Sequence, residues 1–153
     1  MPRRSVRSTG ETANLWRCPQ CRRTFATRNQ THTCARLHDL EHHFVGRDPV
    51  VRELYERVIA VLREIGPVTV LPEKTRIAFQ VRMSFAQVTT RKRWLDGHVV
   101  LARRLDHSRF RRIETFSPRN HLHAFRLEHP DDVDETFAEW MREAYAVGEQ
   151  RHH

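Results

Sequence analysis

This chain of 153 residues lacks any long apolar run and contains only three cysteines and two lysines. No stretch approaches the roughly 18–20 consecutive apolar residues that a membrane-spanning helix requires. Residues 1–15 carry arginines but no apolar core of the kind that a secretory signal peptide has. We therefore expect a cytoplasmic protein that has no membrane partner.

The scarcity of cysteine points to one short segment, because Cys18, Cys21 and Cys34 all lie within 17 residues. An odd number of cysteines in a reducing compartment argues against a disulfide framework and leaves metal binding or redox chemistry. Cys18 and Cys21 form a C-x-x-C pair, in which a tight turn brings two thiolates to one ion. A redox motif of this kind lies at a strand-to-helix junction of a βαβ unit, which the sequence does not show. We therefore predict a zinc site.

Tetrahedral zinc needs a fourth ligand, and His32 and His38 are the two candidates. The spacing found in zinc fingers selects His38, but only if Cys34 and His38 lie one helical turn apart. Asp39 is a suitable cap for a helix that follows, so residues 34–38 are not expected to be helical. His32 and Cys34 would face the same side of an extended segment, so His32 is preferred and His38 stays open. Four protein ligands leave no position for a substrate water, so the predicted zinc is structural.

The scarcity of lysine makes Lys74 and Lys92 stand out among 25 arginines. A GC-rich genome produces the same skew, so the number of arginines is weak support for a nucleic-acid partner. The distribution of the net charge of +8 is more informative, since residues 1–36 carry +7 and residues 37–153 only +1. Within the second part, residues 74–126 carry +10 and residues 128–153 carry −6. A basic arm and a basic middle segment are typical of proteins that contact phosphate.

The apolar pattern predicts a small α+β domain flanked by other segments. Residues 1–15 are predicted to be a disordered basic arm, 16–38 the zinc-binding segment, 39–148 the folded domain and 149–153 a tail. Helical spacing begins near residue 39 and covers 48–65 and 130–147. Strand-like stretches are 68–71, 76–82, 85–89, 98–105, 110–116 and 121–127. Short links rich in Asn, Asp, Gly and Pro favour an antiparallel meander, covered by helices on one face.

A basic cluster that ends in an aromatic residue, Arg91-Lys92-Arg93-Trp94, lies between two predicted strands. More arginines follow on later strands, at positions 103, 104, 109, 111 and 112. On one sheet face these cations would follow a nucleic-acid backbone, with Trp94 stacked on a base. The alternative is a solvated strand edge protected by charge, with Trp94 in the core. The predicted anion or nucleic-acid contacts are Lys74, Arg91, Lys92, Arg93, Trp94, Arg103 and Arg104.

The sequence shows no pattern typical of an enzyme site. His42 and His43 lie beside Glu41, but neither a nucleophile motif nor a glycine-rich phosphate loop accompanies them. We therefore expect binding rather than catalysis. The leading hypothesis is a zinc-binding accessory or regulatory protein that contacts DNA or RNA non-specifically through the arm and a sheet face. The alternative is a module that binds an acidic protein or a small anion, with a purely structural zinc.

Several short segments occur in a characteristic order: Glu41-His-His-Phe44, Gly46, the 51–65 helix, Pro72-Glu-Lys-Thr75, Ile77, Phe79, Phe85, Arg91 to Leu95, and Glu143-Ala-Tyr145. Together they resemble a bacterial family whose domain has unknown function, over about residues 39–148. Its members carry a preceding zinc-ribbon-like segment with C-x-x-C and Asn-Gln-x-His-x-Cys, which matches Asn29 to Cys34. The resemblance implies a fold, a zinc segment and His32 as a ligand. It implies no activity.

Overall fold

The structure is a computed structural model that describes residues 15–19, 24–25 and 39–150. Two short strands come first and are followed by an α+β domain with two helices. In chain order the elements are β1 (Trp16–Arg17), β2 (Thr24–Phe25), η2 (Leu40–Phe44), α1 (Pro49–Ile65), β3 (Thr69–Pro72), β4 (Ile77–Gln80), β5 (Ser84–Thr90), β6 (Leu95–Leu101), β7 (Arg112–Ser117), β8 (Asn120–Leu127), η3 (Pro130–Asp132) and α2 (Glu135–Gly148).

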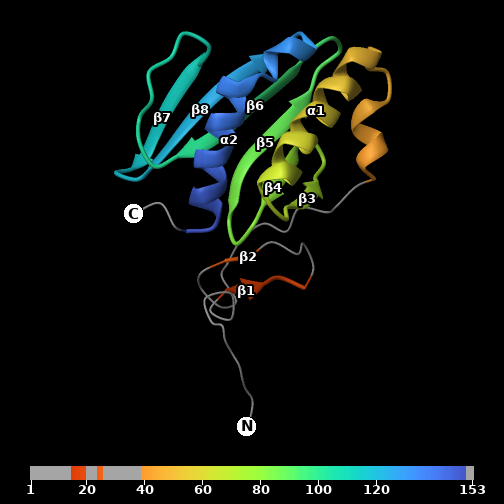
Figure 1. Cartoon of the computed structure of the whole chain (residues 1–153). Helices are drawn as coiled ribbons and strands as arrows, with labels where there is room; N and C mark the ends of the chain where they lie inside the picture. The colour runs from red at the N-terminus through yellow and green to blue at the C-terminus, as the bar shows by residue number, and fades with distance from the viewer. Residues whose placement is uncertain (1–14, 20–23, 26–38, 151–153) are drawn as a thin grey trace.

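The domain is built on a six-stranded antiparallel sheet of order β3-β4-β5-β6-β8-β7, with α1 and α2 on one face (Figure 1). This architecture confirms the predicted α+β class and the placement of the helices. The predicted meander is wrong at one point, because β6 pairs with β8 and β7 lies at the edge. Residues 102–111 form a loop long enough to carry the chain past the position of β8. The β7–β8 hairpin then turns back toward β6.

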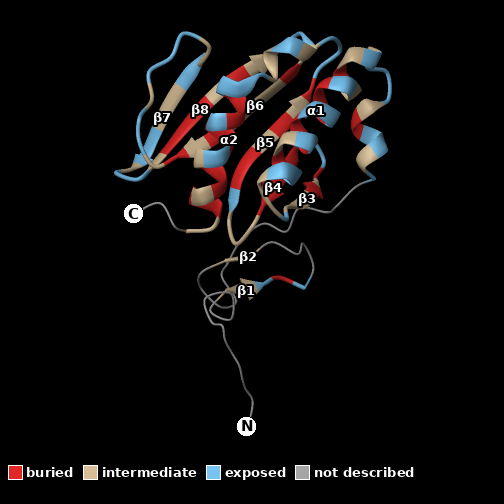
Figure 2. Ribbon diagram, viewed as in Figure 1, coloured by how far each residue is buried: buried red, intermediate tan, exposed pale blue. Residues whose placement is uncertain are grey.

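The core lies between the sheet and the two helices, where Figure 2 shows the buried residues. Helix α1 begins at a proline, which leaves no unpaired N–H at the first helical position. The three- and four-residue spacing of its apolar side chains places Leu54, Val58 and Leu62 at 0% exposure. Phe137 and Met141 of α2 are buried to the same extent. Within the described ranges, no helix is long and apolar enough to cross a membrane.

The C-terminal helix predicted to start at Pro130 is in fact two elements, the short turn η3 and then α2. The carboxylate of Asp132 accepts a hydrogen bond from the His129 N–H at 3.0 Å and so closes the first turn. Asp134 is the N-cap of α2, and its carboxylate accepts from the Phe137 N–H at 2.9 Å. The acidic segment therefore caps two successive turns, which the sequence pattern merged into one helix.

A two-stranded ribbon precedes the domain, with Trp16 paired to Phe25 and their ring centroids 6.0 Å apart. Cys18 in this ribbon is 3% exposed. The hydroxyl of Thr24 donates a hydrogen bond to the carbonyl oxygen of Arg82, which lies between β4 and β5. The ribbon is thus attached to the sheet. Cys21, His32, Cys34 and His38 lie outside the described residues, as do residues 1–14 of the predicted arm and residues 151–153 of the predicted tail.

Candidate anion-binding site

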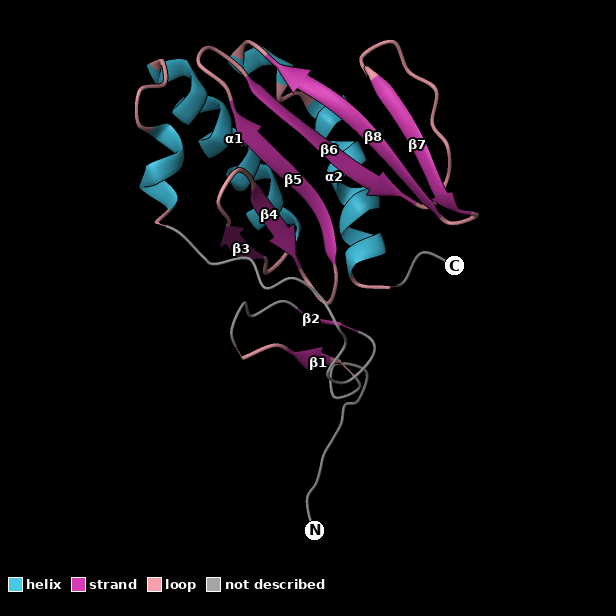
Figure 3. Cartoon of the chain, turned by 180° about the vertical axis from the view of Figure 1, so that it is seen from behind, coloured by secondary structure: helices cyan, strands magenta, loops and turns pink. Residues whose placement is uncertain are grey.

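The face of the sheet opposite the helices carries polar and charged side chains on β5 to β8. Figure 3 shows this face with both helices behind it. Because side chains alternate along a strand, the core residues Leu95 and Val99 of β6 leave Asp96 and His98 on the open face. Strand register aligns two rows of side chains there: Gln87, His98, Ala124 and Arg112, and beside them Thr89, Asp96 and Arg126.

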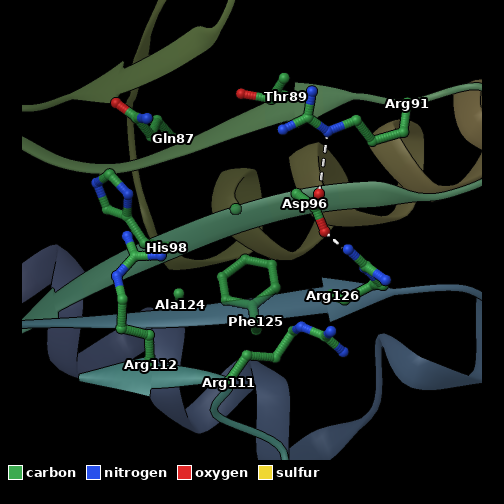
Figure 4. A pocket seen from close by; sticks show the side chains of 11 residues that line it. Gln87, Thr89, Arg91, Asp96, His98, Arg111, Arg112, Ala124, Phe125 and Arg126 are labelled. Atoms are coloured by element: carbon green, nitrogen blue, oxygen red, sulfur yellow. Dashed lines mark hydrogen bonds and ion pairs between the residues drawn. The ribbon is translucent and has the colours of Figure 1, made fainter.

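A hollow of about 250 Å³ opens within these rows. Ala124 of β8 contributes only a methyl group between its register partners His98 and Arg112, which leaves room above the strand. Arg111 precedes β7 and Arg91 follows β5, and both line the same hollow (Figure 4). With Arg112 and Arg126, four arginines from three segments of the chain therefore surround one space.

Three of these arginines are held by carboxylates through the same atom, Nε. Arg91 donates from Nε to Asp96 Oδ2 at 3.0 Å, and Arg126 donates from Nε to Asp96 Oδ1 at 2.8 Å. Arg112 donates from Nε to Glu114 Oε2. Among the described residues, the terminal Nη nitrogens of these three side chains donate to no acceptor. Each guanidinium is thus fixed at its inner edge and offers its outer N–H donors to a ligand.

The carboxylate of Asp96 lies at the centre of this arrangement, between Arg91 and Arg126 (Figure 4). Burial alone would raise the pKa of Asp96, but hydrogen bonds from Arg126, Arg91 and Trp94 lower it below its usual value. The carboxylate is therefore ionised at neutral pH and orients both guanidinium groups. Arg111 makes no ion pair within the described part of the chain, so its whole guanidinium is available.

His98 is the titratable group at the other end of the hollow. Burial, reinforced by the positive charges of Arg76 and Arg112, lowers the pKa of His98 from 6.5 to about 4, and Glu114 opposes this only weakly. The imidazole is therefore neutral at physiological pH and offers one donor and one acceptor. A neutral ring adds polar contacts to the hollow without adding to the repulsion among the arginines.

Of the two predictions made for Trp94, the structure excludes its place in the core, and its stacking on a base stays a prediction. Its ring is half-buried, so it is not a core residue, and the guanidinium of Arg126 lies 4.4 Å from the ring centroid. Its indole Nε1 donates to Asp96 Oδ2 at 3.3 Å. The guanidinium already covers one face of the ring, in a cation–π contact. Trp94 therefore holds Arg126 and Asp96 in position beside the hollow.

The predicted contacts Arg103 and Arg104 lie away from the hollow. Arg103 donates from Nε and Nη2 to the carboxylate of Glu143 on α2, at 3.1 and 2.9 Å, so its side chain faces the helical layer. This pairing with Glu143 also raises the pKa of Arg103. Arg104 pairs with Asp106 at 3.3 Å in the loop after β6.

The remaining predicted cations are in turns between strands and do not line the hollow. Lys74 is exposed between β3 and β4, and Lys92 and Arg93 are exposed between β5 and β6. Arg93 pairs with Asp48 at 3.6 Å, and the carbonyl oxygen of Lys92 accepts from the Asp48 N–H at 2.8 Å. Of the predicted set, the structure thus brings only Arg91 to the hollow, and Trp94 lies beside it against Asp96 and Arg126.

Sequence reasoning missed Asp96, His98 and Arg126 as members of the site. Their alternation along two strands was visible, but their proximity depends on the pairing of β6 with β8. The predicted meander would have placed β7 between them. Arg111 and Arg112 were recognised only as part of a general basic run.

The two other histidines of the sheet, His121 and His123, face the core and serve the fold. His123 Nε2 accepts from the Leu105 N–H at 2.9 Å, so its Nδ1 carries the proton that His121 O accepts at 2.9 Å. Burial lowers the pKa of His123. His121 is hydrogen-bonded through Nδ1 to the Thr115 hydroxyl at 2.9 Å. In the parts of the chain that the structure describes, no three His, Cys, Asp or Glu side chains are grouped to hold a metal ion.

A comparison with known families finds a match over the α+β domain. Residues 40–148 match a family described as "Domain of unknown function (DUF5655)". No curated protein and no solved structure was found to match the chain. The matched region begins at η2 and ends with α2, so it includes the sheet and all four arginines of the hollow. The chain therefore belongs to the DUF5655 family of domains of unknown function.

Proposed function

We propose that this protein binds nucleic acid without base specificity, by receiving phosphate groups in the arginine-lined hollow of the open sheet face. The observation that carries the proposal is the common geometry of Arg91, Arg112 and Arg126. Each is anchored at Nε by a carboxylate and has unpartnered Nη donors among the described residues. Paired guanidinium donors match the spacing of phosphate oxygens, which favours bidentate binding.

Because these arginine side chains are held by carboxylates, they should bind phosphate more tightly as well as in a defined orientation. A free arginine loses rotamer entropy when it binds a ligand, at a cost of roughly 0.5–1.5 kcal/mol for each immobilised side chain. Arg91 and Arg126 already share the two oxygens of Asp96, so part of that entropy is lost on folding instead. The site is therefore organised before the ligand arrives.

The surroundings of the hollow support recognition of the backbone rather than of bases. The ring of Trp94 is covered by Arg126, and the ring of Phe125 packs in the core against Phe137 at 5.2 Å. One face of Trp94 is thus occupied, and Phe125, which is 3% exposed, is too deeply buried for a base to stack on it. Contacts limited to phosphate give little sequence preference and a steep dependence on salt concentration.

We also propose that residues 16–38 bind one structural zinc ion through Cys18, Cys21, His32 and Cys34, with His38 as the alternate ligand. The C-x-x-C spacing and the burial of Cys18 support this site. The carboxylate of Asp39 accepts from the Glu41 N–H at 3.1 Å and so begins η2, as the argument for His32 requires. The basic arm before this segment would add phosphate contacts.

The proposal is tested by titrating a labelled single-stranded oligonucleotide at several salt concentrations. The variant Arg111→Ala/Arg112→Ala removes two cations of the hollow, and Arg57→Ala/Arg63→Ala removes two exposed cations from α1 on the opposite layer. Each phosphate contact on a single strand contributes about 0.7 to the slope of log K against log salt. The first variant should lower that slope by about 1.4, and the second should leave it unchanged. Equal slopes in both variants would refute the proposal.

A second candidate function is the binding of a small anion, and one observation favours it. The arginines converge on one hollow of about 250 Å³, a volume that encloses a single anionic group. In that case inorganic phosphate alone would occupy the site as tightly as an oligonucleotide does. Isothermal titration with phosphate and with the oligonucleotide separates the two functions.

A further inference from the structure

We infer that the hollow is a subsite for a phosphate monoester, the dianionic group found at the end of a nucleic-acid strand. The inference rests on the proposed function and narrows it to chain ends. A phosphate within a strand is a diester, which carries one charge and two free oxygens. A terminal phosphate carries close to two charges at neutral pH and three acceptor oxygens.

The distribution of cations favours a single strongly charged group over an extended backbone. Four arginines line the hollow, three of them paired with acids through Nε, whereas Arg93, Arg103 and Arg104 do not line it. A backbone that crosses a sheet would meet successive cations along a track. In the described part of the chain, four arginines instead gather around one hollow of the open face.

The number of available donors matches the oxygens of a monoester. Arg91, Arg112 and Arg126 each present an outer pair of N–H donors to the hollow after Nε has been used by a carboxylate. Three forks can serve three terminal oxygens, and a diester would leave one fork without a partner. Arg111 adds a fourth cation that no acidic side chain of the described residues neutralises.

The His98 imidazole also suits a dianionic ligand, because the ring is neutral before a ligand binds and can become charged beside one. The groups that face it are Arg76 from the turn before β4, Arg112 and Glu114 from β7, and Gln87 across the β5–β6 register. A dianion placed among them would reverse the local potential and favour the imidazolium. Occupation of the hollow should therefore raise the pKa of His98, which is about 4 without ligand.

The test compares internally labelled oligonucleotides of one sequence that differ only in a 5′-phosphate, a 3′-phosphate or hydroxyl ends. A phosphorylated end should bind about tenfold more tightly than the hydroxyl form, as one further charge-assisted contact implies. Arg111→Ala should abolish this difference, and Arg63→Ala on α1 should retain it. NMR titration of the His98 ring should show its pKa rising when the phosphorylated form is bound and not when the hydroxyl form is bound.

The outcomes separate the inference from the proposed function. Equal, salt-sensitive binding of phosphorylated and hydroxyl forms would overturn the subsite and leave the proposed function intact. Absence of binding by either form would overturn both. Inorganic phosphate serves as a further probe, because binding of phosphate alone as tightly as the phosphorylated strand would assign the hollow to the free anion and overturn the role of a strand end.

Discussion

Acidification should destabilise the fold through His98, because the surroundings of this side chain disfavour its protonated form. Burial and two neighbouring arginines lower the pKa of His98 from 6.5 to about 4 in the folded chain. Between these pH values the unfolded chain binds a proton that the folded chain does not bind. The free energy of unfolding therefore falls as the pH decreases from about 6.5 to about 4, and the contribution of His98 is complete above that window.

The size of the effect follows from the same two values. One pKa unit corresponds to about 1.4 kcal/mol, so the separation between 6.5 and about 4 gives an upper bound of about 3.5 kcal/mol. His98 lies on the open face and is only half-buried, so solvent reduces the penalty of charging the ring. We therefore expect His98 to lower the free energy of unfolding by about 2 kcal/mol between pH 7.5 and pH 4.5.

The assay is urea unfolding of the natural chain and of His98→Gln at pH 7.5 and 4.5. Glutamine keeps a donor and an acceptor but does not titrate, so the natural chain should lose about 2 kcal/mol more than the variant on acidification. All other titrating groups contribute equally to both proteins and cancel. His42→Gln, at an exposed position of η2, is the matched control and should behave like the natural chain. The same loss in the natural chain and in His98→Gln would refute the reasoning.

Three further predictions concern Gly97 under the hollow, the carboxylate of Asp96 that holds two arginines, and the zinc site. A methyl group at Gly97 would lie 2.6 Å from the Gln87 carbonyl oxygen and 2.9 Å from the Phe125 ring. Gly97→Ala should therefore lower the free energy of unfolding in urea by about 2 kcal/mol. Asp96→Asn should lower it by about 1 kcal/mol, because two anchored arginines lose their ionised acceptor, whereas Asp106→Asn should change it by less than about 0.5 kcal/mol. Elemental analysis should find one zinc ion per chain and none in Cys18→Ser, and a metal-free natural chain would contradict the zinc site.

Much of the fold could be predicted because its signals are local. The spacing of apolar residues located α1 within one residue of its start. Alternation identified the strands, although β6 ends at Leu101 rather than at Leu105. The order of strands was missed at β7, because the length of a loop does not say which strand its chain will pass. That choice depends on tertiary packing, which a local pattern does not contain.

The site was predictable only in part for the same reason. Arg91 and Trp94 were identified because they form one basic cluster along the chain. Arg126 lies far from them in sequence and reaches the hollow only through the β6–β8 register, in which Asp96 pairs with it. The roles of Arg103 and Arg104 were predicted from charge alone. The ion pair of Arg103 with Glu143 on α2 depends on the fold, whereas Arg104 pairs with Asp106 two residues along the same loop.

The most direct test of the phosphate site is a chemical-shift map of the full chain, titrated with a 5′-phosphorylated oligonucleotide. The account predicts that the largest shifts fall on the amides of residues 96–98, 111–112 and 124–126 and on the indole N–H of Trp94, which donates to Asp96. The amides of α1 and α2 should move little, because both helices lie on the opposite face. Shifts concentrated on the helices, or none at the residues of the hollow, would contradict the account.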